Sequence, residues 1–117
     1  MRPHEKLGVW SKSVEFVVSL YKATETFPRE EKFGLTSQVR RAAVSVPANI
    51  AEGAARRTAK EFIHFLSIAQ GSTSEVETEL LIAFRLGFLN ERVYKDLCLS
   101  LDEIGRMISG LTQSLKR

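Results

Sequence analysis

The chain has 117 residues, of which 44% are hydrophobic and 26% charged, and its formal net charge is +3. This length suits one globular domain covering residues 1–117, and the balance of apolar and charged residues argues against a disordered chain. A single cysteine, Cys98, excludes an intramolecular disulfide, and no run of about 20 apolar residues is present to span a bilayer. We therefore expect a cytoplasmic protein that does not interact with membranes.

Apolar residues recur at spacings of three and four, which predicts amphipathic helices and gives little support to strands. Residues 1–6 are expected to form an N-terminal tail. The first helix is expected over residues 7–27, because Pro28 does not fit a helix interior. One apolar row of this helix comprises Trp10, Val14, Val17, Tyr21 and Thr24, and a neighbouring row comprises Phe16, Leu20, Ala23 and Phe27.

The second helix is expected to begin within residues 30–35, and Gly53 with the following segment 54–57 is expected to mark its end. Pro47 lies inside its apolar pattern and predicts a kink near Pro47, or a break followed by a restart. The apolar positions of this helix are Leu35, Val39, Ala42, Ala43, Val46 and Ile50.

The third helix is expected to begin at Thr58, which has capping-box spacing to Glu61. Its apolar row continues in phase through Gly71, which favours one long helix over a second start at Ser72. Gly87 is a plausible C-terminal cap before the last turn. The third helix carries Phe62, Phe65, Ala69, Val76, Leu80 and Ala83, with Ser72 or Thr73 between, and the fourth carries Val93, Leu97, Leu101, Ile104, Ile108, Leu111 and Leu115. Four helices joined by short connections predict an all-α fold, an antiparallel up-down-up-down four-helix bundle.

Motifs for catalysis or metal binding have little support. Glu61 and His64 have the Glu-x-x-His spacing of di-iron bundles, but a second such pair is missing and Glu61 is explained by the capping box. Glu75, Glu77 and Glu79 alternate along the third helix, so they do not share a face and are expected on a solvated or interface surface. No glycine-rich nucleotide loop or nucleophile motif is present. We expect no enzymatic activity, no metal site and no cofactor.

A polar stripe follows the second helix at three-to-four spacing and consists of Gln38, Arg41, Ser45, Asn49 and Glu52. It either stabilises the kink, with the Asn49 amide bonding a carbonyl freed by Pro47, or it belongs to a subunit interface, or it binds a ligand.

A group of basic residues lies on the second helix and at its exit: Arg40, Arg41, Arg56, Arg57 and Lys60. These side chains either contact nucleic-acid phosphates or pair with Glu52 and Glu61. The aromatic residues fit core positions, which argues against a base-stacking platform. A second apolar surface for a protein partner is expected from Phe16, Leu20, Ile63 and Ile82.

The run from Gly34 to Gly53 resembles the signature of the four-helix-bundle proteins known as 23S rRNA intervening-sequence proteins, and matches to the same family extend over residues 7–111. Further matching segments are Val9-Trp10, Phe27-Pro28, Glu61-Phe62 and the residues from Phe65 to Ser72. The resemblance implies a four-helix bundle that assembles into a ring, typically a homopentamer. Related accessory proteins of diversity-generating retroelements bind nucleic acid and a reverse transcriptase, and most members have no established biochemical function.

We therefore expect a non-enzymatic oligomer of uncertain cellular role that binds RNA or DNA through the basic group. The polar residues Gln38, Ser45, Asn49 and Glu52 are expected to be structural or to lie at an interface. The alternative is a protein-interaction scaffold or assembly factor without nucleic-acid binding.

Overall fold

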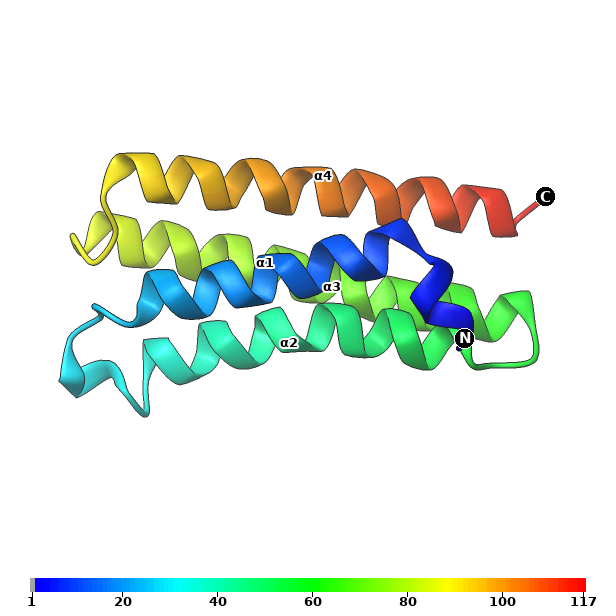
Figure 1. Ribbon diagram of the computed structural model, residues 1–117, viewed down its shortest axis with the longest axis horizontal. Coiled ribbons are helices and arrows are strands. Elements are labelled where there is room, and N and C mark those ends of the chain that lie inside the picture. Colours follow the sequence, from blue (N-terminus) through cyan, green and yellow to red (C-terminus); the bar gives the residue numbers. More distant parts are fainter. Residues whose placement is uncertain (1) are drawn as a thin grey trace.

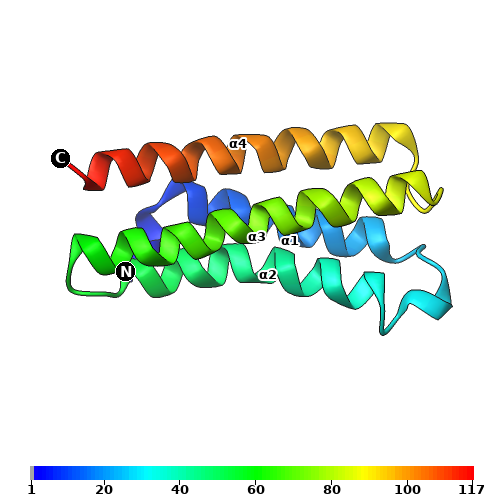
Figure 2. The ribbon, with the colours of Figure 1, turned by 180° about the vertical axis from the view of Figure 1, so that it is seen from behind.

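The computed structural model describes residues 2–117, which form an elongated helical bundle of 44 × 23 × 22 Å. Its α-helices are α1 (Gly8–Thr24), α2 (Leu35–Ala54), α3 (Ala59–Arg85) and α4 (Glu91–Leu115), and its 3-10 helices are η1 (Pro3–Lys6) and η2 (Arg29–Glu31). Successive α-helices run in opposite directions, and α4 packs against both α3 and α1 (Figures 1 and 2). Among the described residues no strand occurs, so the predicted all-α four-helix bundle is confirmed.

The segment expected to be an N-terminal tail is partly structured. The 3-10 helix η1 packs against α1 and α2, and the His4 ring lies edge-on to Trp10 with 4.8 Å between ring centroids. Met1, the first residue of the expected tail, lies outside the described residues.

The buried face of α1 differs from the one predicted. It consists of Val9, Ser13, Phe16, Leu20 and Thr24, whereas Val14 and Tyr21 are exposed. Two polar residues occupy core positions because their hydroxyls bond to their own helix: Ser13 Oγ donates to Trp10 O at 2.8 Å, and Thr24 Oγ1 donates to Leu20 O at 2.9 Å. Of the first predicted row, Thr24 is buried, whereas Ser13 is a buried residue that neither predicted row contained.

Two of the four residues expected to form a second apolar surface are buried. Phe16 and Leu20 are buried in the core, while Ile82 is exposed and Ile63 is half-buried. These residues therefore do not form one surface.

Helix α2 continues without a break through Pro47, whose ring is buried. The break with a restart is therefore wrong, and the kink remains a prediction. Pro47 lacks the N–H that would bond to Ala43 O, but the Asn49 amide does not replace it. Instead, Asn49 Nδ2 donates to Ser45 O at 2.8 Å and to Ser45 Oγ at 2.9 Å.

Helix α3 is one continuous helix through Gly71, as predicted. Thr58 Oγ1 accepts from Glu61 N at 3.1 Å, but the Glu61 carboxylate bonds to the Thr58 hydroxyl rather than to its backbone N–H, so half of the capping box forms. At the other end, Gly87 has a φ of +82°, and Phe88 N donates to Ala83 O at 2.9 Å. This is a Schellman cap, which confirms the predicted role of Gly87.

The core lies along the bundle axis and receives side chains from all four α-helices. Its fully buried aliphatic residues include Leu20, Ile50, Leu66, Leu80, Ile104 and Ile108. Burial of each such side chain contributes about 1.5–3 kcal/mol relative to exposure, so this packing is the main source of stability. Leu66 is a core residue that the predicted row of α3 omitted.

Candidate nucleic-acid interface

Both chain termini and the α2–α3 turn lie at the same end of the bundle (Figures 1 and 2), and basic residues are frequent in these segments. We call this region the basic end. Among the side chains that the structure describes there, the exposed cations are Arg2, Arg56, Arg57, Lys60, Lys116 and Arg117, and the acidic residues are Glu5, Glu52 and Glu61. These described side chains carry an excess of three positive charges, in a chain whose formal net charge is +3. Positive charge is therefore concentrated at one end rather than spread over the surface.

The structure separates the five predicted basic residues into two groups. Arg40 and Arg41 lie in the first half of α2, about 24 Å along the helix from Arg56 at 1.5 Å per residue. Arg40 Nε donates to Thr24 Oγ1 at 2.9 Å, and Arg40 Nη2 donates to Tyr21 O at 3.2 Å. The Arg40 guanidinium also lies 4.5 Å from the centroid of the Tyr21 ring. Arg40 therefore ties α2 to the C-terminal turn of α1, and only Arg56, Arg57 and Lys60 belong to the basic end.

Arg56 is the most restrained cation of the basic end. Its Nη2 donates to Glu52 Oε1 at 2.9 Å, and its guanidinium carbon lies 4.8 Å from the centroid of the Phe65 ring. Pairing with Glu52, one of the two predicted alternatives, therefore occurs for Arg56. Arg57 and Lys60 are exposed and form no ion pair among the described residues.

Phe65 is half-buried beside this cation, rather than a core residue as predicted. Gly53 explains its position, because a Cβ atom at Gly53 would lie 2.8 Å from Phe65 Cβ and 2.9 Å from Phe62 Cδ1. The missing side chain lets α3 approach α2 closely, and Phe65 then lies nearly two helical turns from the N-terminal end of α3. An open hollow of about 630 Å³ adjoins the ring and is lined by Arg56, Thr58, Lys60, Glu61, His64 and Phe65.

The predicted polar stripe of α2 serves several contacts within the chain. Ser45 Oγ lies 2.9 Å from Ser72 Oγ of α3, so Ser45 and Asn49 form a polar link between the two helices. Glu52 bonds to Arg56, as described above. Exposed Gln38 lies with Arg41 beside a shallow groove between α2 and α3.

Glu79 is a polar residue that sequence reasoning misplaced, because the acidic run was expected on a solvated or interface surface. Its side chain is 7% exposed, and Oε1 has no hydrogen-bond partner among the described residues. Burial, together with the negative charge of Glu75, raises the pKa of Glu79 to about 7. Glu79 follows Ser72 by two turns of α3 and so lies on the side of α3 that faces α2.

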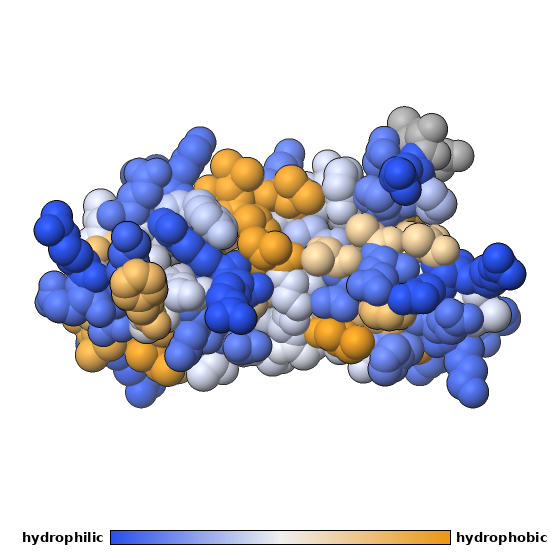
Figure 3. Space-filling view, turned by 90° about the horizontal axis from the view of Figure 1, so that it is seen from below, coloured by the Kyte–Doolittle hydropathy of each residue, from blue (hydrophilic) through white to orange (hydrophobic). Residues whose placement is uncertain are grey.

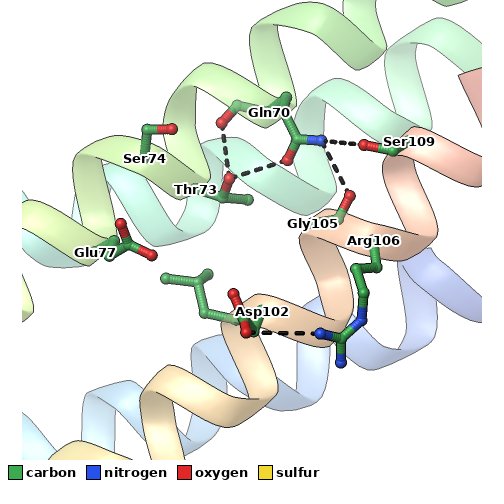
Figure 4. A pocket seen from close by; sticks show the side chains of 9 residues that line it. Gln70, Thr73, Ser74, Glu77, Asp102, Gly105, Arg106 and Ser109 are labelled. Carbon is green, nitrogen blue, oxygen red and sulfur yellow. Dashed lines mark hydrogen bonds and ion pairs between the residues drawn. The ribbon is translucent and has the colours of Figure 1, made fainter.

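A groove between α3 and α4 holds a second group of polar side chains (Figure 4). Gln70 Nε2 donates to Gly105 O and to Ser109 Oγ, both at 3.0 Å. Thr73 Oγ1 donates to Gln70 O at 2.7 Å and to Gln70 Oε1 at 3.1 Å. These groups satisfy one another and join the two helices, so they form a structural contact rather than a catalytic constellation.

Burial raises the pKa of the Cys98 thiol, and burial followed by the contact with Cys98 raises the pKa of Tyr94. A raised pKa keeps the thiol protonated and therefore weakly nucleophilic.

Among residues 2–117, no three His, Cys, Asp or Glu side chains gather in a metal-binding arrangement. No helix in the same range is long and apolar enough to cross a membrane.

The chain is similar in structure to a protein of unknown function from the S23 ribosomal protein family of Bacteroides thetaiotaomicron, known from its crystal structure. The two share 26% sequence identity with a TM-score of 0.80, over 89% of this chain and 97% of that chain. No functionally curated protein matches the sequence. Residues 5–110 match the family described as 23S rRNA-intervening sequence protein. Because this match spans most of the chain, the protein belongs to the 23S rRNA-intervening sequence protein family.

Proposed function

We propose that the protein is a non-enzymatic homo-oligomer that binds RNA through its basic end. The observation that supports this function most strongly is the excess of exposed cations where the chain termini and the α2–α3 turn meet. Arg57 and Lys60 are the best candidates for phosphate contacts, because neither is paired with an acidic side chain among the described residues. Arg40 is not a candidate, since its guanidinium is used inside the bundle.

Phosphate contacts of this kind add affinity without reading sequence, because the backbone carries the same charge at every nucleotide. Each neutralised phosphate releases condensed counterions, and the slope of log K against log salt changes by about 0.7 to 0.9 per contact. The resemblance to ring-forming proteins favours a pentamer, in which several basic ends would act together on one RNA molecule.

A salt titration of binding to a labelled, structured RNA tests this function. We expect binding that weakens log-linearly with salt, and a double variant Arg57→Ala/Lys60→Ala whose slope is shallower by roughly 1.4 to 1.8. The matched control is Lys22→Ala/Arg92→Ala, which removes the same charge from exposed positions near the opposite end. Equal slopes in the two double variants would reject the basic end as the binding surface. No binding by the wild-type oligomer at low salt would reject RNA binding itself.

A second candidate function, assembly with another protein chain, rests on a separate surface. Exposed apolar side chains lie along the outer side of α1 and α2, and Figure 3 shows apolar groups near the middle of one face. Val14, Val18, Tyr21 and Val44 have exposed fractions of 36%, 50%, 39% and 41%. Apolar groups gathered on one surface favour a protein interface. We expect Val18→Glu to lower the assembly mass measured by light scattering, and an unchanged mass would exclude this surface.

A further inference from the structure

The geometry points to a nucleobase-binding pocket at the basic end, in which an unpaired base of the bound RNA stacks on the guanidinium plane of Arg56. This inference rests on the proposed RNA binding and adds a second kind of contact to it. Phosphate contacts supply charge, whereas the pocket would select nucleotides that are not base-paired.

The Arg56 guanidinium lies over the Phe65 ring at the basic end. The guanidinium carbon lies 4.8 Å from the centroid of the Phe65 ring, and Arg56 Nη2 donates to Glu52 Oε1 at 2.9 Å, so two contacts restrain the guanidinium. The side chain of Arg56 remains 42% exposed, so part of it is accessible to a ligand. An arginine plane that is already held in place loses little freedom on binding, and guanidinium planes are common stacking partners of unpaired RNA bases.

A hollow lies beside Arg56 and Phe65. Its volume of about 630 Å³ is within the range of roughly 300–1,000 Å³ found for small-molecule sites. The hollow offers groups that suit the edge of a base: the Glu61 carboxylate accepts hydrogen bonds, and the exposed His64 ring lies edge-on to Phe65 at 5.5 Å. Lys60, at the rim, suits the phosphate of the same nucleotide. Stacking, edge recognition and charge are thus available within one pocket.

A base inside a duplex cannot use this pocket, because both of its faces are already stacked on neighbouring bases. The ligand is therefore an unpaired nucleotide in a loop, bulge or single-stranded end of the RNA. Gly53 makes the pocket possible, since any larger residue would displace Phe65 from its place beneath Arg56.

The test compares a hairpin RNA carrying one bulged 2-aminopurine with a fully paired hairpin of equal charge. We expect the bulged RNA to bind about 5- to 100-fold more tightly, the usual range for one stacked base, with quenching of 2-aminopurine fluorescence. Phe65→Leu should abolish the preference and the quenching but leave the salt slope unchanged. Arg57→Ala should instead weaken both RNAs equally and make both slopes shallower.

Two further variants keep the outcome interpretable. Arg56→Lys retains the charge but loses the planar group, so it should lose the preference even if Phe65→Leu proves unstable. Phe84→Leu removes a half-buried aromatic ring that stacks on Tyr94, 4.4 Å away, near the opposite end of α3, and should change nothing. Equal binding of the two RNAs by the wild type, or a preference retained in Arg56→Lys, would overturn the pocket while leaving RNA binding intact. Failure to bind either RNA would overturn both.

Discussion

Gln70 Nε2 of α3 lies 3.0 Å from the carbonyl oxygen of Gly105 on α4, so a side-chain amide bonds directly to the backbone of the neighbouring helix (Figure 4). A Cβ atom at Gly105 would lie 3.3 Å from Gln70 Oε1, so a larger residue there would crowd the amide. A second bond to Ser109 and the bond from Thr73 complete the contact. We regard Gln70 as the main polar connection between α3 and α4.

Gln70→Ala should lower the free energy of unfolding by about 1–3 kcal/mol, since it removes bonds between two helices and leaves the Thr73 hydroxyl with one partner fewer. Urea denaturation monitored by circular dichroism measures the change. The control is Gln113→Ala, an exposed glutamine in the same groove that makes no side-chain hydrogen bond among the described residues. Equal effects of the two substitutions would contradict the role assigned to Gln70.

Glu79 should make stability depend on pH. Its pKa is about 7 in the folded chain and 4.5 as the reference value, so the folded state retains a proton that the unfolded state loses. Stability is therefore fully present below pH 4.5 and decreases as pH rises towards 7 and above, by at most about 3 kcal/mol.

Urea denaturation at pH 5 and pH 8 tests this dependence. Glu79→Gln should remove most of the decrease and exceed the wild type in stability at pH 8. Glu77→Gln, at an exposed position two residues earlier, should behave like the wild type. Parallel pH profiles of stability for wild type and Glu79→Gln would contradict this prediction, because they would mean that ionising Glu79 costs the folded state little free energy.

Alanine substitutions at two helical glycines should have opposite effects. Gly53→Ala places a methyl group within 3 Å of two phenylalanine side chains, and should destabilise the fold by about 1–3 kcal/mol. Gly71→Ala meets no atom within 4 Å and should stabilise by about 0.5–1 kcal/mol, the difference in helix propensity. Thermal unfolding measures both. A stabilising Gly53→Ala would mean that the phenylalanines move aside freely.

Alanine substitutions at the neighbouring residues Arg40 and Arg41 of α2 should differ in their effect on the free energy of unfolding. Arg40→Ala removes two hydrogen bonds to α1 and the stack on Tyr21, and should destabilise by about 1–3 kcal/mol. Arg41→Ala, at an exposed position without an ion pair among the described residues, should change the free energy of unfolding by less than about 0.5 kcal/mol. Chemical denaturation of the two variants under identical conditions decides the comparison, and similar losses would refute the assignment.

The number of helices and most of their boundaries could be predicted from the sequence, because periodicity and caps are local properties of the chain. The apolar row of α4 predicted its buried residues, Leu97, Leu101, Ile104 and Ile108. Gly87 predicted the end of α3 because a positive φ favours glycine. The family signature in α2 was likewise readable, since it is a property of residue order.

The buried face of α1, the environment of Glu79 and the make-up of the basic end depended instead on how the helices pack. Ser13 has the composition of a surface residue, but it is buried, with its hydroxyl bonded to Trp10 O of its own helix. Glu79 has the pattern of a solvated carboxylate, but it is buried on the side of α3 that faces α2. Arg40 and Arg56 are near in sequence, but a rigid helix separates them by about 24 Å. The surroundings of these side chains are set by contacts between segments distant in sequence, which the local pattern does not specify.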